Sequence, residues 1–304
     1  MDILITGGTG LIGQALIPAL LQKEHQLVLL TRNKKAVNSK FDNPMPHFKA
    51  VVEDLDQVNF NQIDAVINLA GEPIVNKRWS KKQKTILCES RWQLTSRIVE
   101  KIRQADKPPA TLISGSAIGI YGRQNEQTID ESFQAFYPEF SHTLCAEWEK
   151  IAQGAASEST RVCLSRTGIV LSTKGGALSK MLPAFRLGLG GPIASGMQMM
   201  SWIHIDDMVR LLIFLLEHPT ISGPINATAP NPVSNEAFSK ALAASLNRPC
   251  IFRVPKTVLK LAMGEMSDLL IYGQAVVPRK LMEAGFVFSY PQINHAFKAL
   301  MRQH

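Results

Sequence analysis

A glycine-rich turn near the N-terminus constrains the fold more than any other feature of the sequence. The apolar run over residues 2–6 leads into Gly7, Gly10 and Gly13, and a helical apolar pattern begins at Leu11. A short buried strand that turns through spaced glycines directly into a helix is typical of a dinucleotide-binding βαβ unit. In this interpretation Gly7 permits the tight turn, Gly10 lets the backbone approach a pyrophosphate, and Gly13 lets the helix pack closely on the strand.

The helix that follows this turn would present free main-chain N–H groups and the positive end of its dipole to a ligand. Both features favour a phosphate group. We therefore predict that the turn binds a dinucleotide cofactor, with Thr9, Leu11 and Ile12 beside the three glycines. The alternative is a tight turn with no ligand, which a glycine spacing taken out of its strand-to-helix context would equally allow.

The end of the second predicted strand, residues 26–31, indicates which cofactor is bound. NAD-binding units usually carry an acid there, which holds the ribose hydroxyls. This chain has Thr31-Arg32-Asn33 instead. A guanidinium can pair with a ribose 2′-phosphate through charge-assisted hydrogen bonds. We therefore predict NADP(H) in preference to NAD(H), with a surface arginine at a strand end as the alternative role of Arg32.

Two further strand ends fit the same cofactor. Asp54 and Leu55 follow the third predicted strand, where a carboxylate can accept a hydrogen bond from the adenine amino group. Leu69, Ala70 and Gly71 follow the fourth, where small residues leave room for the middle of the cofactor. Each segment alone is also compatible with an ordinary strand-end turn.

Strand-like and helix-like segments alternate along the first two thirds of the chain. This alternation predicts an α/β fold, a doubly wound parallel sheet of the Rossmann type with helices on both faces and a smaller C-terminal lobe. Strands are expected over residues 2–6, 26–31, 48–52, 65–69, 111–114 and 162–165, and helices over 11–22, 80–104, 143–156, 207–216, 235–246 and 257–263.

Glycine and proline become frequent after Arg166, chiefly at residues 175–176 and 188–196. Functional lids are often built from such turn-rich segments, so we expect residues 188–196 to close over a bound cofactor. We assign residues 1–230 to the dinucleotide-binding domain, with 172–200 contributing to the lobe. Residues 249–297 are expected to form a small C-terminal domain.

Composition bounds the class of protein. The 304 residues are 45% hydrophobic and 19% charged, as in an ordinary globular chain. The apolar run over 211–216 is far too short to span a bilayer, and the N-terminus has no basic leader, so we expect a cytoplasmic protein with no membrane association. The four cysteines lack zinc-site spacing, which predicts free thiols and no metal.

The net charge of +8 is partly concentrated between residues 77 and 91. The simpler interpretation is a solvated helix face, and the alternative is a positive rim that attracts a phosphorylated ligand. Nucleic acid is a weaker third interpretation, because no recognition helix and no aromatic-basic interleaving is present. The residues concerned are Lys77, Arg78, Lys81, Lys82, Lys84 and Arg91.

Several motifs together resemble the extended short-chain dehydrogenase/reductases of the NAD-dependent epimerase/dehydratase type. They are TGGTGLIG at the turn, NLAG at residues 68–71, SGSAIGIYG at 114–122 and WIHIDD at 202–207. Segments 88–91, 164–171, 188–192, 277–281 and 284–286 resemble an atypical subgroup labelled as nucleoside-diphosphate-sugar epimerases or SulA-like cell-division inhibitors. This subgroup carries a small C-terminal domain of unknown function, and the resemblance covers essentially the whole chain.

The resemblance implies a catalytic serine, tyrosine and lysine, the last two in a YxxxK motif that lets the tyrosine act as acid and base. Ser114 and Ser116 fall where the serine belongs. Counting back from Glu149 places Ser141 at the tyrosine position and Cys145 at the lysine position. The chain has no YxxxK motif, so this mechanism does not carry over.

Three other side chains are candidates for the missing acid and base. Tyr121, in the YG turn, is the first, with Ser116 as its partner, and a structural tyrosine is the alternative. His142 neighbours the vacant tyrosine position and can titrate near neutral pH, although a helix-surface histidine is the simpler role. Glu72, directly after NLAG, is a third candidate, near the substrate.

Arg91, in the ESR motif of residues 89–91, and Arg166 are candidates for binding substrate anions. His204 and Asp206 belong to a strand-to-helix junction and are expected to hold the lobe to the core rather than to catalyse. Asp206 or Asp207 is expected to cap the helix that follows.

The leading hypothesis is an NADP-dependent oxidoreductase or epimerase that acts on a small nucleotide-sugar-like or anionic substrate. The alternative is a non-catalytic NADP(H) sensor or partner-binding protein, which keeps the dinucleotide turn and dispenses with the catalytic pair. A cell-division inhibitor is a third hypothesis that no residue specifically supports. The resemblance also implies a homodimer formed through the two helices that flank the sheet.

Overall fold

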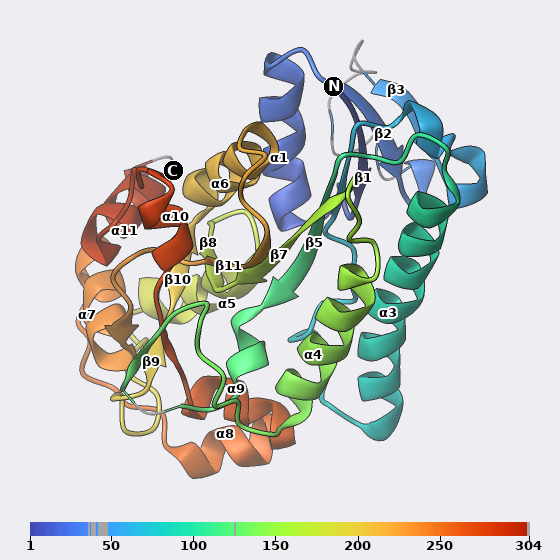
Figure 1. Ribbon diagram of the computed structural model, residues 1–304. Coiled ribbons are helices and arrows are strands. Elements are labelled where there is room, and N and C mark those ends of the chain that lie inside the picture. Colours follow the sequence, from blue (N-terminus) through green and yellow to red (C-terminus); the bar gives the residue numbers. More distant parts are fainter. Residues whose placement is uncertain (36, 38–40, 42–47, 125, 303–304) are drawn as a thin grey trace.

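Seven parallel strands form the central sheet of the protein (Figure 1). The computed structural model describes residues 1–35, 37, 41, 48–124 and 126–302. In spatial order the strands are β11 (Gly223–Ala227), β7 (Arg161–Thr167), β5 (Thr111–Ala117), β4 (Ala65–Asn68), β1 (Asp2–Thr6), β2 (Gln26–Leu30) and β3 (Phe48–Val52). The strand order reverses between β1 and β4. Ligands of doubly wound sheets bind at the carboxyl ends of the strands beside such a reversal.

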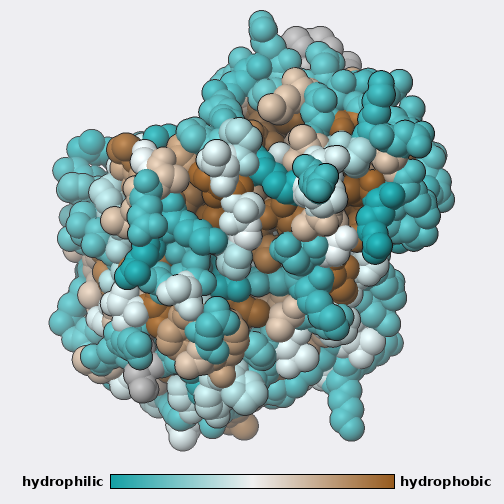
Figure 2. All heavy atoms as spheres, in the orientation of Figure 1, coloured by the Kyte–Doolittle hydropathy of each residue, from teal (hydrophilic) through white to brown (hydrophobic). Residues whose placement is uncertain are grey.

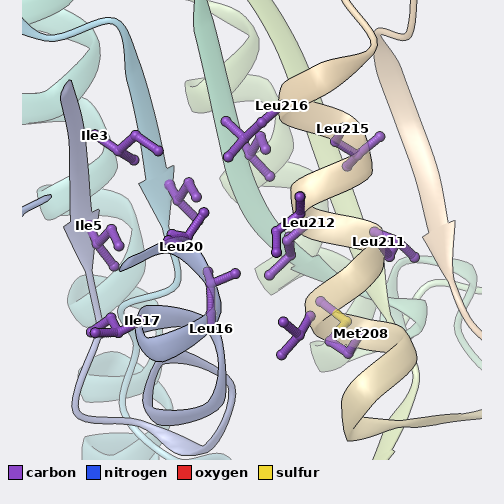
Figure 3. Close-up of a cluster of buried hydrophobic side chains, with 14 of the residues drawn as sticks. Ile3, Ile5, Leu16, Ile17, Leu20, Met208, Leu211, Leu212, Leu215 and Leu216 are labelled. Carbon is purple, nitrogen blue, oxygen red and sulfur yellow. The ribbon is translucent and has the colours of Figure 1, made fainter. Parts of the chain in front are cut away.

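Helices cover both faces of this sheet: α1 (Leu11–Gln22) and α6 (Ile205–Glu217) lie on one, and α3 (Lys81–Gln104) and α4 (Phe140–Gln153) on the other. Successive side chains of a strand point to opposite faces. Ile3 and Ile5 of β1 therefore join the cluster of α1 and α6, whereas Leu4 joins the cluster on the other face. In Figure 3, side chains of α1 fill the space between β1 and α6. The predicted fold class is confirmed.

A third cluster of buried apolar side chains lies outside the sheet and forms the core of the lobe. It joins α5 (Gly176–Arg186), β8 (Ile169–Leu171), β10 (Trp202–His204), α7 (Asn235–Ser245) and α11 (Ile293–Arg302). Residues 172–200 thus pack with the C-terminal segment, although the proposed domain boundaries stay a prediction. The remaining described elements are η1 (Leu55–Gln57), η2 (Phe60–Gln62), η3 (Ile118–Tyr121), β6 (Thr128–Ile129), β9 (Met199–Met200), β12 (Val233–Ser234), α8 (Lys256–Met263), η4 (Gly264–Ser267), α9 (Asp268–Ile271), β13 (Ala275–Val276) and α10 (Arg279–Glu283).

Several elements depart from the predicted ranges, and for β11 and α5 the reason can be identified. The patterns do not predict β11, which contains Pro224. Proline is tolerated there because β11 is an edge strand and has a neighbour on one side only. Nor do they predict α5, which begins after Gly175 and contains Pro183, so its sequence indicates turns instead. Helix α4 begins at Phe140, earlier than the predicted start at residue 143.

The start of α6 corrects a further prediction. Neither Asp206 nor Asp207 caps this helix; the N-cap is His204, whose Nδ1 accepts a hydrogen bond from the Asp206 main-chain N–H at 3.1 Å. The predicted tether is present in another form, because the Asp207 carboxylate accepts from the main-chain N–H groups of Ser289 and Tyr290 at 2.9 and 2.8 Å. The first turn of α6 therefore holds a C-terminal segment against the core.

The surface and the cysteines agree with the bulk composition. Hydrophilic residues cover most of the face in Figure 2, and hydrophobic residues show through mainly toward its middle. No helix in the described part of the chain is both long and apolar enough to cross a membrane. The cysteines are free thiols, as predicted; Cys88, Cys145 and Cys163 are buried and Cys250 is partly exposed.

Candidate functional site

The turn between β1 and α1 lies where the strand order of the sheet reverses, and it packs tightly against the end of β4. Gly7 has a φ of +70°, and a Cβ there would lie 2.6 Å from the Leu69 carbonyl carbon at the end of β4. A Cβ at Gly13 would lie 2.5 Å from the Cα of Gly8. Only glycine therefore lets the turn approach β4 and lets α1 approach the turn, which are the roles predicted for these two positions.

The N-terminus of α1 offers hydrogen-bond donors that no side chain in the described part of the chain caps. Its N-cap is Gly10, and its first turn contains no acidic residue. By contrast, Ser80 and Ser234 cap α3 and α7 with their side chains. The Gln14 side chain braces the turn by donating to the Thr9 carbonyl at 2.8 Å. First-turn N–H groups, a positive dipole end and a close-packed turn together fit a pyrophosphate.

The ends of β2 and β3 carry an exposed cation, Arg32, and a carboxylate, Asp54, that is already engaged. Arg32 is exposed beyond β2 and makes no hydrogen bond or ion pair with another described residue. The Asp54 carboxylate accepts from the Asp56 main-chain N–H at 3.1 Å and from Arg97 at 2.6 Å. These two donors, the N–H first, hold the pKa of Asp54 below its ordinary value. The Leu55 side chain is buried in the core, so only its main chain can contact a ligand.

The end of β4 is held against the turn by a buried polar network. Thr6 Oγ1 donates to Asn68 Oδ1 at 2.6 Å and accepts from the Ala70 main-chain N–H at 3.2 Å. Beyond it, Ser90 Oγ accepts from the Glu72 N–H at 3.0 Å, and Arg91 donates to the Glu72 carbonyl at 3.0 Å. Both the N–H and the carbonyl of Glu72 are therefore hydrogen-bonded. Its half-buried carboxylate makes no ion pair or hydrogen bond with another described residue.

The two predicted serines do not present free hydroxyls. Ser114 is fully buried, and its Oγ contacts the Gly115 carbonyl at 3.3 Å. Ser116 Oγ donates to the Glu149 carboxylate at 2.6 Å. That carboxylate also receives two hydrogen bonds from Arg166, at 2.9 and 2.8 Å. Arg166, which was predicted to bind substrate anions, forms a buried ion pair with Glu149, and its binding of a substrate stays a prediction.

Tyr121 belongs to the same buried network. Its side chain is fully buried, and its hydroxyl donates to Asn226 at 2.7 Å and accepts from Arg166 at 3.0 Å. Burial raises the pKa of Tyr121, and the Arg166 charge offsets this only in part. A buried hydroxyl with a raised pKa is a poor acid or base near neutral pH. The geometry therefore favours the structural alternative for Tyr121.

The positions that resemble the YxxxK pair hold groups with no such chemistry. Ser141 is buried and donates to the Glu139 carboxylate at 2.8 Å. Burial raises the pKa of Cys145 to about 12, so its thiol stays protonated. His142 is half-buried, with Nδ1 2.6 Å from the Ile120 carbonyl and its ring stacked on Phe136.

The lobe approaches the turn through a segment that the sequence did not single out for this position. A Cβ at Gly175 or Gly176 would lie 3.2 or 2.9 Å from the Leu11 side chain, so the start of α5 rests on the start of α1. The predicted lid over residues 188–196 pairs with the C-terminal segment instead, through hydrogen bonds such as Ala194 N–H to the Val254 carbonyl at 2.9 Å. The available signal was the glycine pair at residues 175–176, which indicates a turn and not a contact with α1.

Part of the basic cluster faces the lobe. Lys84 pairs with Glu265 at 2.5 Å, and Arg78 donates to the Leu261 carbonyl at 3.3 Å. On the other side of the loop after β4, Lys180 of α5 donates to Asn76 at 2.7 Å. Core and lobe are therefore joined across the carboxyl edge of the sheet by flexible cationic side chains.

Comparison with known proteins agrees with this architecture. The NAD dependent epimerase/dehydratase family matches residues 3–227, and a domain of unknown function, DUF1731, matches residues 254–300. An epimerase family protein of Mycobacterium bovis, Mb2239, is 38% identical over 97% of this chain and 95% of its own. The chloroplastic SDR39U1 homolog of Arabidopsis thaliana is 38% identical over 99% and 87%. The crystal structure of human epimerase family protein SDR39U1 with NADPH matches with a TM-score of 0.91 and 32% identity over the full length of both chains.

Proposed function

Because the chain belongs to the NAD dependent epimerase/dehydratase family, we propose that it is an NADP(H)-dependent oxidoreductase or epimerase. Its substrate would be a small anionic or nucleotide-sugar-like molecule. The observation that carries this proposal is the uncapped N-terminus of α1 beside Gly7, at the reversal of the sheet. The human relative solved with NADPH supports the choice of coenzyme.

The residues of the turn and of the neighbouring strand ends would hold the coenzyme. First-turn N–H groups of α1, at Leu11 and Ile12, would bind the pyrophosphate. Exposed Arg32 would bind the 2′-phosphate, because no acid occupies that strand end. The main chain at Leu69 to Gly71 would line the middle of the coenzyme, with Ser114 buried beneath it. When bound, NADPH supplies a hydride.

The chain's own groups must then handle a proton without a tyrosine and lysine pair. A substrate carbonyl carbon that accepts the hydride leaves an oxygen that must accept a proton. The half-buried Glu72 carboxyl is the group we assign to this transfer, since its main chain is fixed and its side chain is not engaged elsewhere. Ser116 and Tyr121 would have a structural role, because they are hydrogen-bonded to the buried Glu149 and Arg166 pair.

Coenzyme binding tests the first half of this proposal. We expect wild-type protein to bind NADPH and NADP⁺ more tightly than NADH and NAD⁺ in calorimetric titrations. Arg32→Ala should weaken binding of the phosphorylated coenzymes by about tenfold or more, the order expected for a lost charge-assisted contact, and leave the others nearly unchanged. Equal or tighter binding of NADH by the wild type would contradict the assignment.

A non-catalytic NADP(H) sensor is the second candidate. One observation favours it. Ser116, Tyr121 and Arg166 are buried, and both hydroxyls are hydrogen-bonded to buried groups of the protein itself. A panel of ketone, aldehyde and nucleotide-sugar substrates, followed by NADPH absorbance and by sugar epimerisation, separates the two. Tight NADPH binding without turnover on the whole panel would favour the sensor.

A further inference from the structure

Arg91 is a half-buried cation that forms no ion pair with a carboxylate among the described residues. Its guanidinium donates to the carbonyl oxygens of Leu87 and Glu72 at 2.9 and 3.0 Å, and it lies over the Trp148 ring at 5.3 Å. By contrast, Arg166 is buried and is neutralised by the Glu149 carboxylate, to which it donates two hydrogen bonds. The contrast matters because a buried charge without a counter-ion is costly.

None of the described groups around Arg91 forms an ion pair with it. The thiols of Cys88 and Cys145 are neutral, because burial raises the pKa of each. The Glu72 carboxylate acts on the guanidinium electrostatically without forming an ion pair with it. Carbonyl acceptors such as Leu87 and Glu72 would be satisfied equally well by a neutral amide donor. The hydrogen bonds therefore explain a donor at position 91 and do not explain a charge.

The place of this charge in the fold suggests what it acts on. A Cβ at Gly71 would lie 2.8 Å from the Arg91 Cζ, so the guanidinium lies directly against the loop that follows β4. Trp148, the ring that Arg91 covers, packs against β5 at Gly115. If the pyrophosphate binds at β1 and the adenosine over β2 and β3, the nicotinamide half would lie over β4 and β5. Arg91 is thus on the nicotinamide side of the reversal, opposite to Arg32.

We propose that Arg91 makes this site select the reduced coenzyme, NADPH, over NADP⁺. The inference rests on the proposed binding of NADP(H) and deepens it. The oxidised nicotinamide ring carries a positive charge that the reduced ring lacks, and a fixed cation in a poorly solvated site repels only the oxidised form. The hydrogen bond that Arg91 donates to the Glu72 carbonyl and the one that Ser90 accepts from the Glu72 N–H position the loop, and the charge biases the redox state of the coenzyme that the loop accepts.

The test compares dissociation constants of NADPH and NADP⁺ for the wild type, Arg91→Gln, Arg91→Lys and Ser90→Ala. We expect the wild type to bind NADPH about tenfold more tightly, and Arg91→Gln to bring the ratio of the two constants close to one. Arg91→Lys keeps the charge and should keep most of the ratio even where both affinities fall. Ser90→Ala removes the hydroxyl that accepts from the Glu72 N–H and, at 3.4 Å, from Arg91, without changing charge, so the ratio should stay at the wild-type value.

Three outcomes would overturn the inference. The first is a wild type that binds NADP⁺ as tightly as NADPH. This result overturns the inference by itself, even if Arg91→Gln does not fold. An Arg91→Gln protein that folds, as judged by its thermal unfolding, and keeps the wild-type ratio would show that the residue acts only as a structural clamp. If neither NADPH nor NADP⁺ binds to the wild-type protein, the coenzyme proposal itself is overturned, and this inference with it.

Discussion

At the scale of single residues, the proposed chemistry depends on Glu72. Its main chain is held by Ser90 and Arg91, which are adjacent on α3, so its position relative to β4 is fixed. Its carboxylate is half-buried and unengaged by the described residues. A fixed backbone with an available acidic side chain at the carboxyl edge of a parallel sheet is what a proton-transferring residue requires.

Replacing Glu72 and Tyr121 separately should therefore give different results. Glu72→Gln should abolish most turnover, by about a hundredfold or more, and leave the NADPH dissociation constant nearly unchanged. Tyr121→Phe should lower the free energy of unfolding by about 1–3 kcal/mol, because the buried Asn226 and Arg166 lose a partner, with little effect on turnover per folded molecule. Loss of turnover in Tyr121→Phe with full activity in Glu72→Gln would reverse the assignment.

Sequence position could not reveal the role of Tyr121. The motif that contains it is visible, but its hydrogen-bond partners Arg166 and Asn226 lie 45 and 105 residues away. Residue types indicate which groups can act as acids, bases or anion binders. Whether such a group is engaged elsewhere is decided by tertiary packing, which neither spacing nor motif carries. The same reason explains why the ion pair between Arg166 and Glu149 could not be predicted.

At the scale of secondary-structure elements, the start of α6 links the core to the C-terminal segment. The His204 ring stacks on the Tyr290 ring, with centroids 3.8 Å apart, and its Nδ1 caps the helix. Because Nδ1 accepts a hydrogen bond, the neutral ring carries its proton on Nε2, a buried atom without a partner among the described residues. A second proton on the ring would remove the cap.

This arrangement predicts a pH-dependent stability. Burial lowers the pKa of His204, and the charges of Asp206 and Asp207 offset this only in part. As pH falls below the ordinary histidine value of about 6.5, the unfolded state binds the proton first, so the free energy of unfolding decreases. The contribution is fully present above that pH. His204→Asn, whose amide oxygen can still cap α6 and does not titrate, should lose less stability.

Urea unfolding at about pH 7.5 and about pH 5.5 measures this difference, since the two conditions lie on either side of the ordinary histidine pKa. The wild type should lose more stability than His204→Asn between the two conditions. An identical loss in both proteins would show that His204 does not contribute to the pH dependence.

Among the elements, the ones with strong local patterns could be predicted and the others could not. The turn after β1 and the strands over residues 2–6 and 48–52 follow directly from glycine spacing and apolar runs. The edge strand β11 and helix α5 contain prolines or begin at glycines, and their structure depends on packing against β7 and the lobe. Local preference is a weak guide where tertiary contacts decide the conformation.

At the scale of the whole molecule, α3 and α4 lie side by side on one face of the sheet (Figure 1). Their outer surfaces border a groove of about 510 Å³, whose lining includes Val99 and Ile151 among charges of both signs.

We predict that this face, formed by α3 and α4, is the interface of a homodimer. Light scattering should give twice the chain mass for the wild type and a monomer for Ile151→Arg, whereas Met282→Arg, in a different pocket, should stay dimeric. A monomeric wild type would contradict the prediction.

The central claim is that the close-packed turn at Gly7 presents the N-terminus of α1 to the pyrophosphate of NADP(H). Calorimetric titration of NADPH into two matched variants tests it most directly. Gly7 and Gly285 both have positive φ, at +70° and +84°, but a Cβ at Gly7 would lie 2.6 Å from the Leu69 carbonyl carbon, whereas one at Gly285 would meet no atom within 4 Å. Gly285→Ala should bind NADPH like the wild type, and Gly7→Ala should bind at least about tenfold more weakly, because the turn must move. Unchanged NADPH binding by a folded Gly7→Ala protein, or no binding heat from the wild type, would contradict the account.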